Sequence, residues 1–389
     1  MQETLFTIGA GPVDMYPEVR AAFTRPQPSD GDPAFLAFYQ RVNEKLTRVL
    51  RSTTPATILQ SEAILGIEAA AASLIAREDV VLNLASGIYG KGFGYWAARY
   101  AKEVVEIETP YDQTIDPADV EAMLRQRPEI AVVSVVHHET PTGIINPVRE
   151  IGAVVRRHGA LLIVDAVSSF GGMDVHPDDI PSDIFVAGPG KCLGGAPGLT
   201  CLAVSERAWR KIEGNKDAPF ASVLSIKDWK EAHRAERGFP FTPLMADMQG
   251  LDAALDRYLA EGPETVWRRH ALTAQACRAG AKAMGLKLWP VRESDAAPTV
   301  TAIRSPEGID AERVVAAARE RYGVVLSAGV SELTQRVLRI GHMGPTAHPT
   351  HAMLALLALG GALRGLGVRI DLAAGIDAAM KVADAAAAG

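Results

Sequence analysis

Between about residues 60 and 205, short apolar segments alternate with segments that have the pattern of helices. The apolar segments are nearly continuous, which is typical of strands in a parallel sheet covered on both faces. The expected strands are 80–84, 104–107, 130–136, 161–164, 184–187 and 200–204, and the expected helices are 64–75, 93–100, 117–125 and 148–158. The sequence therefore predicts an α/β fold built on a mostly parallel sheet.

The pattern changes after about residue 250. Two long helices are expected at 247–261 and 263–284, followed by short strands mixed with helices. This is typical of a smaller α+β domain, and 389 residues are enough for two domains. We predict a large domain over residues 15–260 and a small C-terminal domain over 261–389, joined by residues 1–14.

Composition narrows the possible partners and the compartment. The net charge of −6 argues against nucleic acid or an anionic membrane as the main partner, and no segment is long enough to span a bilayer. The N-terminus lacks the pattern of a secretory signal. Three cysteines without metal-ligand spacing favour a reducing compartment. We expect a cytoplasmic protein that acts on small molecules.

A carboxylate and an amine follow two of the expected strands. Asp165 ends the strand 161–164, and Lys191 follows the strand 184–187 after a Gly-Pro-Gly turn. Open α/β proteins bind ligands at the carboxyl edge of the sheet. An Asp and a Lys at that edge could hold a pyridine ring by its nitrogen and its aldehyde carbon. Lys191 would be the Schiff-base lysine, although a surface lysine and a turn-capping Asp165 remain open alternatives.

Three further residues have both a functional and an ordinary interpretation. Glu62 precedes an expected helix, at the kind of N-terminus that attracts anions, and either complements the helix dipole or takes the place of a phosphate. Tyr89, in the glycine-rich segment 86–94, is either an aromatic lid on a ring or a core tyrosine in a strand–helix turn. Arg339 either binds a substrate carboxylate or is a solvated strand arginine.

The adjacent His137 and His138 do not predict a metal site. They end an expected strand, where successive side chains point to opposite faces of the sheet. Joint ligation of one ion is therefore improbable, and we expect no metal.

Taken together, these motifs resemble the class V aminotransferases of PLP (pyridoxal 5′-phosphate) fold type I. The matching stretches lie between about residues 9 and 344, and they are GAGPVDMYP, LGIEAA, HHETPTG, IVDAVSSFGG, GPGKCLGGAPG and RIGHMG. Within that class the chain is most similar to a subfamily that takes free pyridoxamine or pyridoxal as substrate. The resemblance therefore implies that no cofactor is tightly bound.

The resemblance also assigns roles to residues on the vitamin side of the site. Lys191 would bond to pyridoxal and move a proton between the two reacting carbons. Asp165 would keep the ring nitrogen protonated, and Tyr89 and Val167 would sandwich the ring. Glu62 would occupy the position at which relatives bind the coenzyme phosphate.

The remaining roles concern the phenolic oxygen, the subunit interface and the keto acid. Thr140 could bond the ring's phenolic oxygen, and Phe241 would reach in from a second subunit. Arg339 would hold the acid's carboxylate. The chain departs from the subfamily at Val330, where a second arginine is expected, and around Ser29, where a tyrosine is expected. These departures leave the preferred keto acid open.

The predicted activity is the transfer of the amino group of pyridoxamine to a 2-keto acid, for which pyruvate is the first candidate, giving pyridoxal and L-alanine in vitamin B6 degradation. The resemblance implies a homodimer or homotetramer with its sites at the dimer interface. The alternative is a conventional PLP-dependent aminotransferase of the alanine–glyoxylate or serine–pyruvate type, for which PLP would be the cofactor. A non-catalytic binding protein for B6 vitamers is a third possibility.

Overall fold

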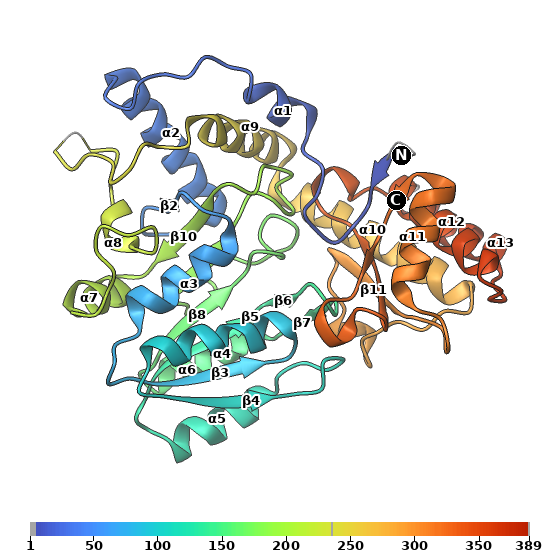
Figure 1. Cartoon of the computed structure of the whole chain (residues 1–389), viewed down its shortest axis with the longest axis horizontal. Coiled ribbons are helices and arrows are strands. Elements are labelled where there is room, and N and C mark those ends of the chain that lie inside the picture. Colours follow the sequence, from blue (N-terminus) through green and yellow to red (C-terminus); the bar gives the residue numbers. More distant parts are fainter. Residues whose placement is uncertain (1–4, 235, 388–389) are drawn as a thin grey trace.

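The computed structural model describes residues 5–234 and 236–387. Its central element is a seven-stranded sheet with the strand order β2-β10-β9-β8-β5-β3-β4 (Figure 1). Strand β10 runs antiparallel to both of its neighbours, and the other neighbouring pairs are parallel. The strands are β2 (Thr57–Leu59), β3 (Val80–Ala85), β4 (Glu103–Glu108), β5 (Ile130–Val136), β8 (Leu161–Asp165), β9 (Ile184–Ala187) and β10 (Thr200–Val204). The prediction of a mostly parallel sheet in an α/β fold is confirmed.

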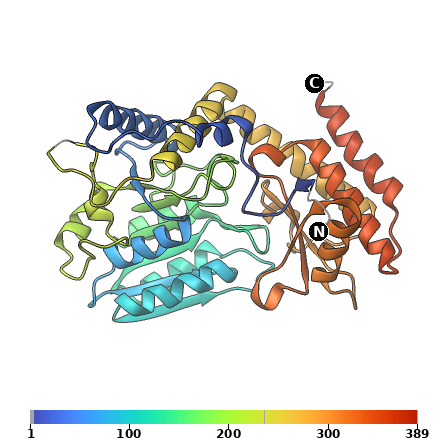
Figure 2. The ribbon, with the colours of Figure 1, turned by 45° about the horizontal axis from the view of Figure 1, so that its top comes forward.

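Helices cover both faces of this sheet, as Figures 1 and 2 show. Leu162 and Val164 of β8 belong to one buried hydrophobic cluster, whereas Leu161 and Ile163 belong to the cluster on the opposite face. This alternation follows from the two-residue period of a strand. One face packs against α2 (Pro33–Leu50), α5 (Pro117–Gln126), α6 (Val148–Arg157) and α9 (Met245–Glu261), and the other against α3 (Ala63–Leu74), α4 (Ile88–Tyr100), α7 (Glu206–Gly214) and α8 (Ile226–Trp229).

The C-terminal part has its own sheet and core. Strands β11 (Val300–Arg304), β14 (Val337–Gly341) and β13 (Ser327–Ala328) form an antiparallel sheet, which packs with α10 (Pro263–Ala283), α11 (Ala311–Tyr322), α12 (Pro349–Gly365) and α13 (Leu372–Ala387). The N-terminal strand β1 (Phe6–Thr7) pairs with β12 (Val324–Val325), and Ile8 lies in this second core. The boundary that we predict near residue 260 stays a prediction, and this separate core supports it.

One expected helix begins earlier than predicted. The glycine-rich segment 86–94 is expected as a turn before a helix at 93–100, but α4 already begins at Ile88. Its first turn is possible because a buried carboxylate from a distant strand, Glu139 of β6 (His138–Glu139), accepts hydrogen bonds from two of its backbone N–H groups. Tyr89 therefore lies on the first turn of a helix and not in a loop.

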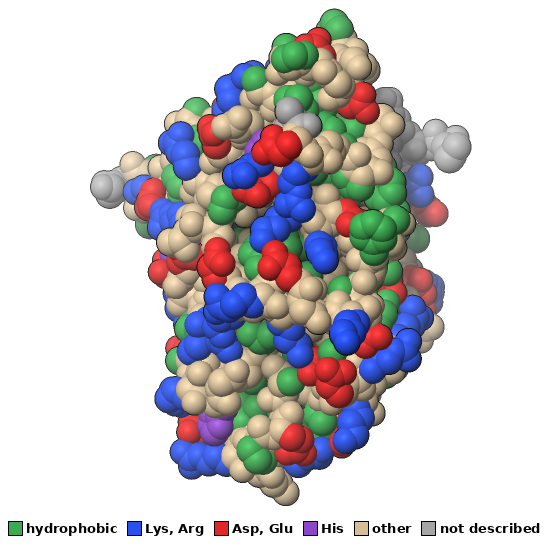
Figure 3. Space-filling model, turned by 90° about the vertical axis from the view of Figure 1, so that its left-hand side faces the viewer, with side chains coloured by type: hydrophobic (Ala, Val, Ile, Leu, Met, Phe, Trp, Pro, Cys, Tyr) green, Lys and Arg blue, Asp and Glu red, His purple; other side chains and the backbone are tan. Residues whose placement is uncertain are grey.

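The surface carries charges of both signs. In the view of Figure 3, Lys and Arg side chains are interspersed with Asp and Glu side chains and with scattered hydrophobic ones. None of the helices in residues 5–234 and 236–387 combines the length and the apolar composition needed to cross a membrane.

Candidate active site

Strands β8 and β9 place Asp165 and Lys191 at the same edge of the sheet. Asp165 is the last residue of β8 and is paired in register with Val186 of β9, which runs parallel to it. The turn after β9 brings Lys191 back over this edge, where its Nζ donates a hydrogen bond to the backbone oxygen of Ala10 at 3.4 Å. A Cβ atom at Gly11 would overlap Nζ, so glycine at that position leaves room for the amine.

Lys191 lines two adjoining cavities of about 310 and 170 Å³. Glu62, Tyr89 and Val167 line both, and Asp165 lines the smaller one. The larger cavity is completed by Gly11, Pro12, Ala63, Gly188, Gly190, Pro197 and Leu199, and the smaller one by Ile64, Ile67 and Ser168. This combined volume is typical of a site for a small organic ligand. The structure thus brings together five of the predicted site residues around one space.

The amine of Lys191 is held in a state that favours nucleophilic chemistry. Burial lowers its pKa because the charged form loses hydration, and the nearby positive charge of Arg339 lowers the pKa further. The carboxylates of Glu62 and Asp165 oppose this effect but are smaller contributions. A larger fraction of the amine is therefore neutral, and the neutral amine is the form that attacks a carbonyl carbon.

The carboxyl group of Asp165 is half-buried and lines the smaller cavity. Burial raises its pKa to about 6, while a hydrogen bond from the backbone N–H of Val167, 2.9 Å from Oδ1, and the charge of Lys191 act in the opposite direction. A protonated pyridine nitrogen placed against this carboxylate would replace the hydration that it has lost. Asp165 is thus suited to pair with a cationic ring nitrogen.

Glu62 caps the helix that borders the cavity. It is the N-cap residue of α3, and its Oε2 accepts a hydrogen bond from the backbone N–H of Ile64 at 2.8 Å. The side chain is exposed, but it lines both cavities. Both interpretations considered from the sequence therefore agree with its position: it satisfies the helix terminus, and it presents a negative charge to the ligand space.

The side chain of Arg339 contacts the backbone of Thr140. The Nη1 of Arg339 donates to the carbonyl oxygen of Thr140 at 3.3 Å, and its Nε donates to the carbonyl oxygen of Ala328 at 2.8 Å. The hydroxyl of Thr140 is hydrogen-bonded to that of Ser168. Both residues are buried, which excludes the solvated-arginine alternative for Arg339.

Phe241 lies away from the cavities of its own chain. Its ring packs against Trp229, with the two ring centroids 6.1 Å apart, and it is 37% exposed. Its contact with a second subunit stays a prediction.

Glu139 is a site residue that sequence reasoning missed. It is completely buried, and its two carboxylate oxygens accept hydrogen bonds from the backbone N–H groups of Tyr89 at 3.1 Å and Gly90 at 2.6 Å. Burial raises its pKa to about 7, although these two hydrogen bonds act against the shift. A Cβ atom at Gly87 would lie 2.5 Å from its Cδ. Gly87 and Gly90 were the available signal, because a Cβ atom at either position would come within 3.0 Å of this carboxylate.

The two histidines that precede Glu139 are buried and hydrogen-bonded. The Nδ1 atom of His137 lies 2.8 Å from the hydroxyl of Ser169, and the Nδ1 atom of His138 lies 3.0 Å from that of Thr299. Burial lowers the pKa of His137 to about 3 and that of His138 to about 4, so both rings are neutral at physiological pH. They are best described as structural groups beneath the site.

Comparisons with known proteins agree with this geometry. The sequence model of the family described as "Aminotransferase class-V" matches residues 37–345. The chain is 55% identical to pyridoxamine–pyruvate transaminase of Mesorhizobium japonicum over 98% of both chains, and 32% identical to L-aspartate–glyoxylate aminotransferase of Paracoccus denitrificans over 95% and 94%. The crystal structure of pyridoxamine–pyruvate aminotransferase from Mesorhizobium loti superposes with a TM-score of 0.97 at 55% identity, covering 98% of each chain.

These comparisons overturn the expectation that no cofactor is tightly bound. The matched family consists of PLP-dependent enzymes of fold type I, so a PLP cofactor is expected and the earlier expectation is wrong. The site fits the ring of PLP, because a half-buried carboxylate and a half-buried amine line one cavity beside Tyr89 and Val167. When bound, PLP supplies a ring that withdraws electrons from the reacting carbon. The chain belongs to the class V aminotransferases.

Proposed function

We propose that this aminotransferase moves the amino group of pyridoxamine to pyruvate, giving pyridoxal and L-alanine. The relative at 55% identity over 98% of the chain carries the name of this reaction. The observation that carries the proposal is the convergence of Lys191 and Asp165 on one cavity that Tyr89 and Val167 also line. These four residues offer an amine, a carboxylate and two flat or branched apolar surfaces, which together complement a pyridine ring.

Each side chain has a specific task in this proposal. Lys191 takes a proton from one reacting carbon and returns it to the other, for which its lowered pKa is favourable. Asp165 keeps a positive charge on the ring nitrogen, and Tyr89 and Val167 fix the plane of the ring. Glu62 faces the substituent of the ring that would carry a phosphate in PLP.

On the acceptor side, we assign Arg339 to the carboxylate of the keto acid and Thr140 to the phenolic oxygen of the vitamin. A guanidinium has five N–H donors, and Arg339 uses two of them for the carbonyl oxygens of Ala328 and Thr140. Its Nη2 group is therefore available for a substrate carboxylate.

The test is turnover of pyridoxamine with pyruvate, followed by the formation of pyridoxal and of L-alanine. Lys191→Ala should abolish it, because the variant lacks the group that moves the proton. The exposed Lys381, which pairs with Asp377, provides the matched control Lys381→Ala, which should retain wild-type activity. Turnover that persists in Lys191→Ala would refute the proposal, as would a wild-type enzyme that uses alanine with glyoxylate but not pyridoxamine.

We also propose that the enzyme is a homo-oligomer with its sites at a subunit interface. Ile64 lines the smaller cavity and is 37% exposed, and Leu65 beside it is 41% exposed. Leu244 is 41% exposed, and its backbone N–H is hydrogen-bonded to the side chain of Gln60, close to α3. Exposed apolar side chains at the mouth of a cavity are typical of a surface that a second subunit covers. Light scattering on the purified protein tests this, and a monomer at micromolar concentration would contradict it.

Vitamin B6 breakdown in the cytoplasm is the setting that we propose for this reaction. Cys192, Cys201 and Cys277 are free and buried, which suits a reducing compartment. Fractionation of cells that produce the protein tests the location, and growth on pyridoxamine as a nutrient source tests the pathway. Enrichment of the protein outside the cytoplasm, or unchanged growth of a deletion strain, would contradict the respective part.

A further inference from the structure

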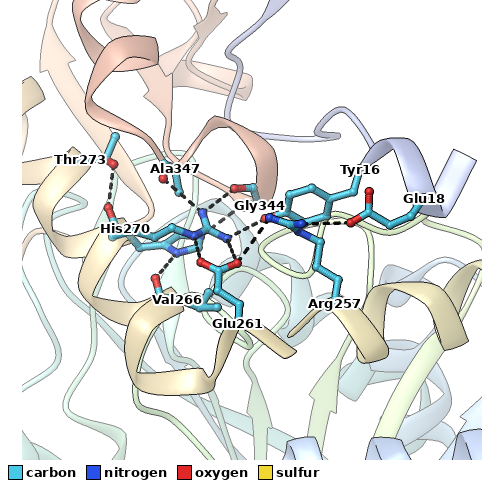
Figure 4. Close-up of polar contacts among 10 residues, drawn as sticks. Tyr16, Glu18, Arg257, Glu261, Val266, His270, Thr273, Gly344 and Ala347 are labelled. Carbon is cyan, nitrogen blue, oxygen red and sulfur yellow. Dashed lines mark hydrogen bonds and ion pairs between the residues drawn. The ribbon is translucent and has the colours of Figure 1, made fainter. Parts of the chain in front are cut away.

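A polar cluster around Arg269 contacts the turn that carries Lys191. We define this Arg269 cluster by Tyr16, Glu261, Arg269, Gly344 and Ala347 (Figure 4). Its members come from the segment before α1 (Pro17–Ala22), from the end of α9, from α10 and from the turn after β14. Three parts of the chain that are distant in sequence, at Tyr16, at residues 261–269 and at residues 344–347, therefore meet at the side chain of Arg269.

The guanidinium of Arg269 makes contacts in several directions at once. Its Nη1 donates to the carbonyl oxygens of Gly344 at 2.7 Å and Ala347 at 3.1 Å, and its Nη2 donates to the hydroxyl oxygen of Tyr16 at 2.6 Å. Its Nε pairs with Oε1 of Glu261 at 2.5 Å. Because the guanidinium is planar and rigid, these contacts fix its partners relative to one another.

Two of these partners pack directly on the turn that carries Lys191. The backbone N–H of Tyr16 donates to the carbonyl oxygen of Gly194 at 3.2 Å, and the N–H of Gly194 donates to the carbonyl oxygen of Lys191 at 3.0 Å. A Cβ atom at Gly194 would lie 2.6 Å from the ring of Tyr16, and one at Gly344 would lie 3.0 Å from the Cα of Gly194. Gly194 and Gly344 thus have no room for a side chain. A displacement of Tyr16 or Gly344 would therefore also move the turn that carries Lys191.

We propose that Arg269 is a positioning residue for Lys191: it holds Tyr16 and Gly344 against the turn and thereby fixes the place of the amine in the cavity. Arg269 would act through these two residues and not by contact with substrate. The inference rests on the proposed function where turnover is the readout, but binding of pyridoxal provides a readout that does not require turnover. A purely structural role would change stability without changing the ionisation of Lys191.

The test compares Arg269→Lys with Arg268→Lys. The first keeps the positive charge but loses the planar fork, and the second makes the same change at a neighbouring exposed arginine. We expect Arg269→Lys to lower kcat by about 10- to 100-fold, since a displacement of about 1 Å of a reacting group has an effect of this size. The KM for pyridoxamine should change less than about threefold. The pH at which the absorbance of bound pyridoxal changes should shift, whereas Arg268→Lys should match the wild type in all three.

Tyr16→Phe gives a second measurement in case Arg269→Lys does not fold. It removes the hydroxyl that accepts from Arg269 but keeps the ring against Gly194. It should shift the absorbance transition in the same direction and by a smaller amount. Unchanged kcat and an unchanged transition in both variants would overturn the inference, as would a loss of thermal stability without either effect. If the wild type does not turn over pyridoxamine, the proposed function fails, and the absorbance transition still decides the role of Arg269.

Discussion

Replacement of Arg339 gives the most informative prediction for the acceptor side of the site. The side chain is 8% exposed, and it donates to the carbonyl oxygens of Ala328 and Thr140, which leaves Nη2 for a substrate carboxylate. Arg339→Lys would keep a charge but lose the fork geometry, and Arg339→Met would lose both. Each charge-assisted hydrogen bond to a carboxylate contributes about 1.5–3 kcal/mol.

The expected magnitude follows from these contacts. The loss of a two-point contact in a buried site should cost at least about 3 kcal/mol of transition-state stabilisation, which corresponds to about a 100-fold lower kcat/KM for pyruvate. The KM for pyridoxamine should remain within about threefold, because Arg339 is assigned to the other substrate. The buried carbonyl group of Thr140 and the half-buried one of Ala328 also lose their donor in Arg339→Met, so its free energy of unfolding should fall by about 2 kcal/mol.

The same substitution has a second, independent consequence. The charge of Arg339 lowers the pKa of Lys191, so its removal in Arg339→Met should raise that pKa. Activity rises with pH as Lys191 loses its proton, so this rise should occur at a higher pH in Arg339→Met. In Arg339→Lys, which keeps a positive charge, it should stay near the wild-type pH. The assay is initial-rate kinetics with varied pyruvate and pyridoxamine across a range of pH, together with thermal unfolding. An equal loss for both substrates, or an unshifted pH limb in Arg339→Met, would refute the assignment.

Three further predictions concern the vitamin side. Glu139→Gln should raise the KM for pyridoxamine several-fold, because the amide cannot accept from both Tyr89 and Gly90; an unchanged KM would contradict this positioning of Tyr89. The pKa of Glu139 is raised from 4.5 to about 7, so the folded state binds this proton more tightly than the unfolded state does. The resulting contribution to stability should be lost as pH rises from about 4.5 to 7. Over that range, the free energy of unfolding measured by chemical denaturation should fall more steeply for the wild type than for Glu139→Gln. Glu62→Gln should strengthen the binding of PLP relative to pyridoxal by about fivefold, since one partly screened charge contributes on the order of 1 kcal/mol, and an unchanged ratio in absorbance titrations would argue against an electrostatic role.

The parts of the fold that follow from local pattern were predictable. The strands at 130–136, 184–187 and 200–204 have the predicted bounds, because continuous β-branched and apolar residues specify buried strands directly. The meeting of Asp165 with Lys191 followed from the rule that ligand groups gather at the carboxyl edge of a parallel sheet.

The start of α4 was not predictable from local sequence. Glycine has a low helix propensity, so the segment 86–94 has the composition of a turn. The group that makes a helix possible there is Glu139, which lies far along the chain and is brought in by the sheet. The partners of Arg339, the backbone oxygens of Ala328 and Thr140, are equally non-local.

The cofactor expectation failed for a different reason. It gave one exposed carboxylate, Glu62, more weight than the rest of the site. The cavity that fits the ring of PLP is also lined by Asp165 and Lys191. A single partly screened charge does not decide whether a ligand with many contacts is retained.

The reversed direction of β10 has a mechanical consequence. The segment that carries Lys191 leaves the central sheet at the end of β9 and re-enters it at β10, and these two strands are hydrogen-bonded neighbours. The amine is thus tethered at both ends to the same rigid body as Asp165, whereas Arg339 belongs to the C-terminal sheet. A shift of the C-terminal sheet would therefore move Arg339 relative to Asp165, and it would also reach Lys191, because Gly344 after β14 packs on the turn that carries the amine.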